Sequence, residues 1–118
     1  MQDLPTSSEL TTAITREPDG VRLMIGGELD MNGVIAIERA VNEAIATAEG
    51  PQLTIDLTEL RFMDLFGARA LLRVADEANQ APRQVAIVNP RRHVRRLFEL
   101  ITDLAPGRSL VAELVRRD

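Results

Sequence analysis

The sequence predicts a small α/β domain built on a mixed sheet of about four to five strands with about four helices. A turn sequence typical of a β-hairpin lies near the N-terminus. After it, segments whose apolar residues alternate as in a strand take turns with segments whose apolar residues have helical spacing. At 118 residues the chain is long enough for one domain with a real core and too short for two. Strands separated by helices imply parallel pairing with right-handed crossovers, so the helices cover one side of the sheet or both.

The N-terminal part predicts an antiparallel hairpin after a flexible leader over residues 1–9. Two alternating segments, residues 10–16 and 21–25, flank Glu-Pro-Asp-Gly at residues 17–20. Proline, aspartate and glycine together are typical of a turn that joins two paired strands. We expect a single domain over residues 10–118, with this hairpin at one edge of its sheet.

The middle of the chain predicts helix, strand and helix in succession. Apolar residues at helical spacing indicate a helix from Asn32, its expected cap, to about Ala48, and Gly50-Pro51 ends it. Residues 53–57 alternate as a short strand. A second helix follows the cap Asp64 and ends near Gln80.

The C-terminal part predicts one more strand and two helices. Residues 84–88 form the strand, Asn89 is the expected cap, and Pro90 stands at the first helical position. The outward face of this helix carries arginines that we expect to be solvated and paired with Glu99 or neighbours: Arg91, Arg92, Arg95 and Arg96. Residues 109–117 fit a helix capped by Ser109 better than a strand, although a strand stays open.

Composition excludes several kinds of site. Cysteine is absent and there is one histidine, so we expect neither a metal site nor another cofactor. The net charge of -4 and a pI near 5.0 disfavour nucleic-acid binding. Gly26-Gly27 lacks the spacing of a nucleotide-binding loop. No signal peptide or membrane-spanning segment is evident, and we expect a cytoplasmic protein without direct membrane insertion.

The segment Asp64-Leu65-Phe66-Gly67 is unusual for the start of a helix. Asp64 can cap the first free N–H groups, but Leu65 and Phe66 can bond to none. Either these two side chains fold inward, or Phe66 stands out as an apolar anchor for a partner. Asp30 and Asp64 should share the carboxyl edge of the sheet. No nucleophile or metal site accompanies them, so we interpret them as caps and expect no enzyme activity.

Several motifs, taken in order, resemble the STAS domain of bacterial anti-sigma factor antagonists, also called anti-anti-sigma factors. They are Gly-Glu-Leu-Asp at residues 27–30, IDLTELRFMD at 55–64, Gly67 with the stretch 69–72, and Asn89-Pro90 before an arginine-rich helix that contains Leu-Phe-Glu-Leu at 97–100. Gly-Glu-Leu-Asp alone is common, whereas the combination extends over nearly the whole chain. The resemblance implies the STAS fold and a regulatory, protein-binding function in transcription.

The resemblance also identifies a degenerate phosphoacceptor site. In such antagonists the loop usually reads Asp-Ser-Ser-Gly or Asp-Ser-Thr-Gly, and the hydroxyl after the aspartate is phosphorylated by a partner that is both kinase and anti-sigma factor. Here Leu65 occupies the acceptor position and Phe66 the next, and neither carries a hydroxyl. A second departure is Ala68, where the family more often has a leucine that touches the partner.

The resemblance therefore implies an anti-sigma factor or kinase-like regulatory protein as the partner, bound without phosphorylation at this loop. The implied partner-binding residues are Glu28, Asp30, Asp64, Leu65, Phe66, Gly67, Ala68 and Arg69. The alternative is a STAS accessory subunit of a membrane transporter or a scaffold component of a signalling assembly. The N-terminal hairpin has an exposed edge that can pair with a second copy of the chain, so a homodimer remains an alternative.

Overall fold

The computed structural model describes residues 10–104 and 115–116 of the chain. Its strands are β1 (Thr11–Glu17), β2 (Gly20–Leu29), β3 (Gln52–Asp56), β4 (Leu60–Met63), β5 (Gln84–Val88) and β6 (Val115–Arg116). Its helices are the 3₁₀ turn η1 (Met31–Gly33) and the α-helices α1 (Val34–Thr47), α2 (Leu65–Ala78) and α3 (Arg92–Leu104). The strands follow the order β1-β2-β3-β5-β6, and β4 pairs with β2 outside this path.

The predicted fold class is confirmed. β1 and β2 form the antiparallel hairpin, whereas β2 with β3, β3 with β5 and β5 with β6 are parallel. The turn is tighter than expected, because Glu17 pairs directly with Gly20. β2 also extends to Leu29, four residues beyond the predicted end of this strand.

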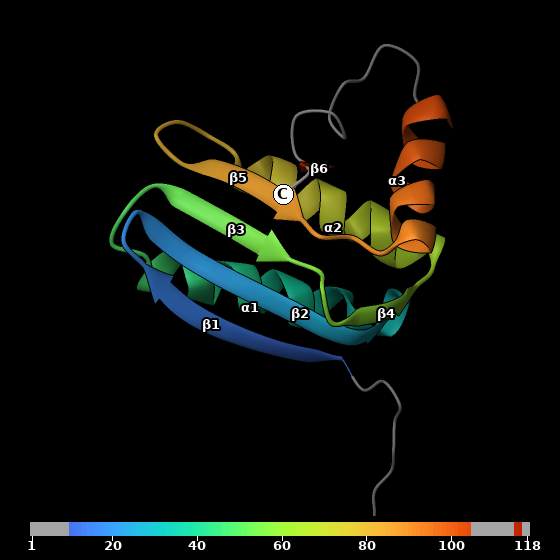
Figure 1. The fold of residues 1–118 in the computed structure, drawn as a ribbon, viewed down its shortest axis with the longest axis horizontal. Helices are drawn as coiled ribbons and strands as arrows, with labels where there is room; N and C mark the ends of the chain where they lie inside the picture. The colour runs from blue at the N-terminus through green and yellow to red at the C-terminus, as the bar shows by residue number, and fades with distance from the viewer. Residues whose placement is uncertain (1–9, 105–114, 117–118) are drawn as a thin grey trace, which may run out of the picture.

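Helices α1 and α2 lie side by side against one face of the sheet, and α3 stands at its end against α2 (Figure 1). Alternation along the strands explains this layering, since every second residue points toward the helices. Val21, Leu23 and Ile25 of β2 are fully buried on that side, with Ile55 of β3 and Ile87 of β5. Phe98 fixes α3 to the same core.

Strand β4 was predicted as part of the connection between residues 57 and 64. The strand was hard to predict because Leu60 and Met63 are buried while Arg61 and Phe62 are exposed. Its residues therefore lack the simple apolar alternation of a strand. Gly27, with φ 83°, accommodates a shift of register where β2 meets β4. The short strand brings the chain to Asp64 directly beside the end of β2.

Two predicted helix caps were wrong. Asn32 does not cap α1; the backbone N–H of Asn32 instead donates to the carboxylate of Asp30 at 2.9 Å, and α1 begins at Val34 after Gly33. Asn89 adopts the left-handed conformation with φ 59°, and α3 begins at Arg92. Its side chain bonds across the sheet instead of to its own helix.

The predicted terminal helix was wrong where the structure describes it. Val115 and Arg116 form β6, which pairs in parallel with β5. The rest of the predicted helix, including Ser109, lies outside the described residues, as does the expected leader over residues 1–9. The described part therefore holds three α-helices in place of about four.

Candidate functional site

Asp30 and Asp64 lie at the same edge of the sheet, as predicted. They follow Leu29 and Met63, which are paired residues of β2 and β4, and the N–H of Asp64 donates to the carbonyl of Leu29 at 3.2 Å. Each carboxylate accepts a bond from its own turn, Asp30 from the N–H of Asn32 at 2.9 Å and Asp64 from the N–H of Gly67 at 2.8 Å. Both residues therefore act as turn formers, and Asp64 caps α2.

Gly67 holds the start of α2 close to the end of β2. A Cβ atom at Gly67 would lie 2.6 Å from the carbonyl oxygen of Leu29, which no real side chain tolerates. Ala68 follows it and is completely buried. The partner contact implied for Ala68 does not fit this structure, because its side chain is packed in the core; Gly67 likewise serves the close approach of two elements.

Phe66 stands out from the start of α2. Its side chain is 61% exposed, whereas Leu65 before it is half-buried. Of the two interpretations of this loop, the outward one therefore describes Phe66. Single exposed apolar residues are common on protein surfaces, so what matters is which other side chains surround it.

Two further apolar residues are exposed at the neighbouring helix start. Met31 of η1 is 60% exposed and Ile35 of α1 is 64% exposed, and η1 contacts α2. Neither residue was among the predicted site residues; the available signal was their spacing of four, which places them together outside the buried stripe of α1. We call Met31, Ile35 and Phe66 the apolar edge surface. Glu28 and Arg69, both exposed, flank the same strand end and helix start.

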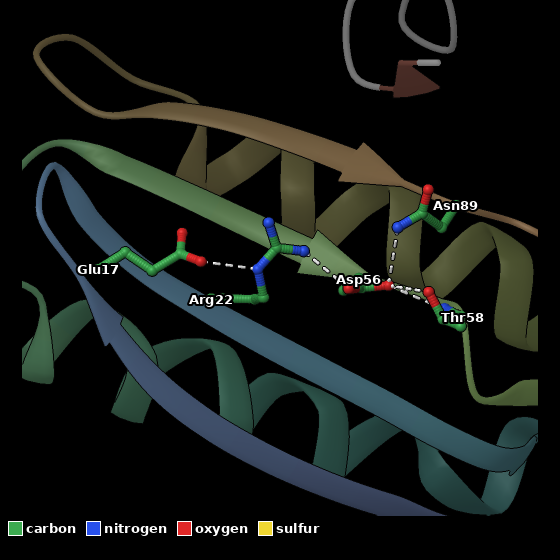
Figure 2. A network of polar contacts seen from close by, with 5 residues as sticks. All are labelled: Glu17, Arg22, Asp56, Thr58 and Asn89. Atoms are coloured by element: carbon green, nitrogen blue, oxygen red, sulfur yellow. Dashed lines mark hydrogen bonds and ion pairs between the residues drawn. The ribbon is translucent and has the colours of Figure 1, made fainter. Parts of the chain in front are cut away.

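A polar network crosses the helix-free face of the sheet (Figure 2). Arg22 of β2 lies between two carboxylates, with Nε 2.8 Å from Glu17 and Nη1 2.7 Å from Asp56. The other oxygen of Asp56 accepts bonds from the N–H of Thr58 at 2.9 Å, its hydroxyl at 2.6 Å and the amide of Asn89 at 3.3 Å. The network joins β1, β2 and β3 to the loop that leads into α3.

The hydrogen bonds of this network keep Asp56 ionised although it is buried. Burial raises the pKa of a carboxyl group, but the bonds from Thr58, Asn89 and Arg22 outweigh it and hold the pKa of Asp56 below its ordinary value. Every oxygen of the carboxylate has donors, which is the arrangement a buried charge requires. We assign the network a structural role.

Other kinds of site find no support within the described residues. Over residues 10–104 and 115–116, no three His, Cys, Asp or Glu side chains gather in a way that could hold a metal ion. Within the same ranges, none of the helices is long and apolar enough to cross a membrane.

Comparison with known families settles which domain this is. A family model described as "Mlab, STAS domain" matches residues 12–102. The chain belongs to the STAS domain family. No curated protein matches it.

Solved structures with the same STAS fold come from different kinds of protein. The anti-sigma factor antagonist SpoIIAA in its unphosphorylated form is 20% identical with a TM-score of 0.67, covering 92% of this chain and 88% of that one. An anti-sigma factor antagonist from Mycobacterium paratuberculosis is 24% identical with a TM-score of 0.68, covering 86% and 84%. The murine Solute Carrier 26 family member A9 anion transporter is 16% identical with a TM-score of 0.66, covering 80% of this chain and 16% of the transporter.

Proposed function

We propose that this STAS domain is a non-enzymatic regulatory module of a bacterial cytoplasm that binds an anti-sigma factor or kinase-like protein. Binding uses the apolar edge surface and the polar residues beside it, Glu28, Asp30, Asp64 and Arg69. The observation that carries this function is the exposure of Phe66 at the start of α2. The solved anti-sigma factor antagonists of the same fold support the choice of partner class.

Binding at this loop proceeds without phosphorylation there. Phosphoryl transfer needs a nucleophilic hydroxyl, and Leu65 and Phe66 have none. In the described conformation the carboxylate of Asp64 is already used as the helix cap. The module is therefore permanently competent at this loop, and its abundance controls how much partner it captures.

The apolar edge surface supplies enough contact to anchor a partner. Full burial of a large apolar side chain stabilises a complex by roughly 1.5–3 kcal/mol, and aromatic residues are frequent hot spots. Phe66, Met31 and Ile35 already lie mostly in solvent, so a partner can cover them without unfolding any part of the domain. The capped start of α2 holds Phe66 in place, which reduces the entropy lost on binding.

The test is capture of the partner from the native cell by the wild-type chain and by a Phe66→Ala variant. We expect the variant to fold normally and to lose the kinase-like or anti-sigma partner, with affinity reduced about tenfold or more. Arg16→Ala, which removes an exposed side chain of β1 at the opposite end of the hairpin from Leu29, is the control and should retain the partner. Full affinity of a folded Phe66→Ala variant would contradict the proposed surface.

A second measurement tests the absence of the usual switch. After incubation with ATP and the recovered kinase, mass spectrometry should find no phosphate on residues 64–67. Phosphate elsewhere, for example on the exposed Thr58, would show that the protein is switched by another residue and would contradict control by abundance alone.

The alternative function is an accessory subunit of a membrane transporter or a scaffold piece of a signalling assembly. The likeness of this fold to part of an anion transporter favours it. The same capture experiment separates the two functions. Recovery of transport components alone would replace the regulatory function with the accessory one.

A further inference from the structure

The start of α3 carries a concentration of positive charge that has no ion-pair partner among the described residues. Arg91, Arg92 and Arg96 are exposed and Arg95 is half-buried. Among the described residues, the predicted ion pairs with Glu99 or neighbours do not form; the ion pairs present involve Arg16, Arg22 and Arg73. Arg91 makes one hydrogen bond, from Nε to the carbonyl of Thr58 at 3.3 Å.

This placement works against the helix. Arg91 and Arg95, and likewise Arg92 and Arg96, are four residues apart, where like charges repel one another on a helix surface. They also lie at the helix N-terminus, where the macrodipole is positive and disfavours cations, and the first turn contains no acidic residue. Residues that oppose local stability without compensation within the fold often serve a function.

An apolar strip runs beside these arginines along the same helix face. His93, Arg96, Leu97 and Leu100 have the spacing of one face and, with Glu99, line a surface hollow of about 430 Å³. Leu100 is 46% exposed, whereas Val94 and Phe98 on the opposite face are buried in the core. We call Arg92, His93, Arg96, Leu97 and Leu100 the α3 face.

Two hydrogen bonds attach the start of α3 to neighbouring parts of the fold. His93 donates from Nε2 to the carbonyl of Arg61 at 2.7 Å, and Arg91 bonds to the carbonyl of Thr58. Thr58 lies between β3 and β4 and Arg61 lies in β4, so these bonds tie the start of α3 to the sheet. A surface that is ordered before binding loses less entropy when a partner arrives.

We propose that the α3 face binds an acidic segment of a partner protein. Carboxylates of the segment would pair with Arg92 and Arg96, and an apolar side chain between them would enter the hollow beside Leu97 and Leu100. Guanidinium groups are well suited to carboxylates because they donate in a planar fork. This surface is additional to the apolar edge surface, which lies at the starts of α1 and α2.

The observations favour a protein segment over the other anionic partners. Single-stranded nucleic acid usually stacks on aromatic side chains, and Phe98, the aromatic residue of α3, is buried. Duplex-binding domains are usually basic, whereas the net charge of this chain is -4. An anionic membrane is a broad surface that responds to the whole chain, whose net charge is -4. A narrow segment responds to the local patch, because solution charges are screened beyond about 8–10 Å.

The experiment uses a synthetic amphipathic peptide with glutamates four residues apart and one leucine between them, labelled for fluorescence anisotropy. The charge reversal Arg92→Glu with Arg96→Glu should weaken binding about tenfold or more, since two charge pairs are lost. The matched control is Arg16→Glu with Arg39→Glu, which changes the net charge equally at exposed arginines away from α3. The control should bind as the wild type does at physiological salt.

A second pair of changes tests the hollow. Leu100→Ala should weaken binding several-fold, and replacing the leucine of the peptide by serine should add little further loss in that variant, because the two side chains form one contact. Phe66→Ala should bind the peptide normally, so the outcome does not depend on the proposed function. Equal loss in the Arg16/Arg39 control, or binding to vesicles containing phosphatidylglycerol without binding to the peptide, would overturn the proposal.

Discussion

The starts of α2 and α3 are held in place in different ways. At α2, Asp64 caps the first turn and Gly67 lets the backbone rest on Leu29, so local chemistry and packing support the same structure. At α3, Asn89 turns away to bond Asp56, and arginines occupy the positive end of the helix. The start of α2 is close-packed and exposes the apolar side chain of Phe66. The start of α3 is instead held by hydrogen bonds to residues outside the helix, and it exposes positive charge.

This difference separates two kinds of exposed residue. The side chain of Phe66 is mostly exposed and takes no part in the cap of α2, and single exposed apolar side chains are common on protein surfaces. The arginines of α3 reduce the stability of the helix that carries them. The comparison therefore predicts that changes at α2 damage stability through packing, while a change at α3 can improve it.

The largest expected effect is at Gly67. Gly67→Ala forces a Cβ atom against the carbonyl oxygen and side chain of Leu29, at 2.6 and 2.9 Å, so α2 and β2 must move apart. We expect a loss of about 3 kcal/mol in the free energy of unfolding, near the upper end for overpacking. Urea unfolding followed by circular dichroism measures it.

The neighbouring exposed residue provides the control for that prediction. Arg69→Ala removes an exposed side chain from the same helix and should change stability by less than about 0.5 kcal/mol. If Gly67→Ala unfolded at the same urea concentration as the wild type, the close approach of α2 to β2 would be wrong.

The next effect tests how α3 is tied to the sheet. Asp56→Asn replaces a buried carboxylate that accepts from Arg22, Thr58 and Asn89 by a group that must donate at one of these positions. We expect a loss of about 2 kcal/mol at neutral pH, because hydrogen bonds to charged groups are the strong ones. Amide hydrogen exchange of the Asp56→Asn variant should show faster opening at the start of α3 than in α2. Equal protection of the two helices would contradict the inference that Asp56 holds α3 to the sheet.

The pH dependence of stability gives an independent check on the same carboxylate. The folded state lowers the pKa of Asp56 below that of an unfolded aspartate, about 3.9, so its contribution is complete well above that value. It is lost as the pH falls through 4 and below the folded pKa, because protonation favours the unfolded state. The wild-type chain should therefore lose more stability in acid than Asp56→Asn, and parallel pH profiles would contradict this assignment.

The fold was predictable because its elements follow regular patterns. Residues 84–88 form the predicted strand with the predicted bounds, and the hairpin follows from Glu-Pro-Asp-Gly. Strand β4 was missed because only its ends, Leu60 and Met63, are buried. Asn89 was misassigned because Asn-Pro is typical of a helix cap, and only the tertiary bond to Asp56 shows its actual use.

The candidate sites were less predictable, since exposure depends on tertiary packing. The capping role of Asp64 could be predicted from local chemistry, whereas the direction of Phe66 could not, because inward and outward positions fit the same sequence. Arg22 and Asp56 looked like ordinary outward residues of two strands. Their pairing depends on the parallel register of β2 and β3, which no local pattern specifies.

The smallest expected effect is a gain in stability at α3. Arg92→Glu removes the repulsion with Arg96 and places a negative charge in the first turn, where the helix dipole favours it. We expect the free energy of unfolding to rise by about 0.5 kcal/mol at low salt and less at high salt, because surface charges are screened. Thermal unfolding at two salt concentrations measures this, with Arg39→Glu in the middle of α1 as the control that should show no gain. A stability gain together with weaker binding of the acidic peptide would identify Arg92 as a residue retained for contact rather than for folding, whereas a loss of stability would mean that its charge supports the helix after all.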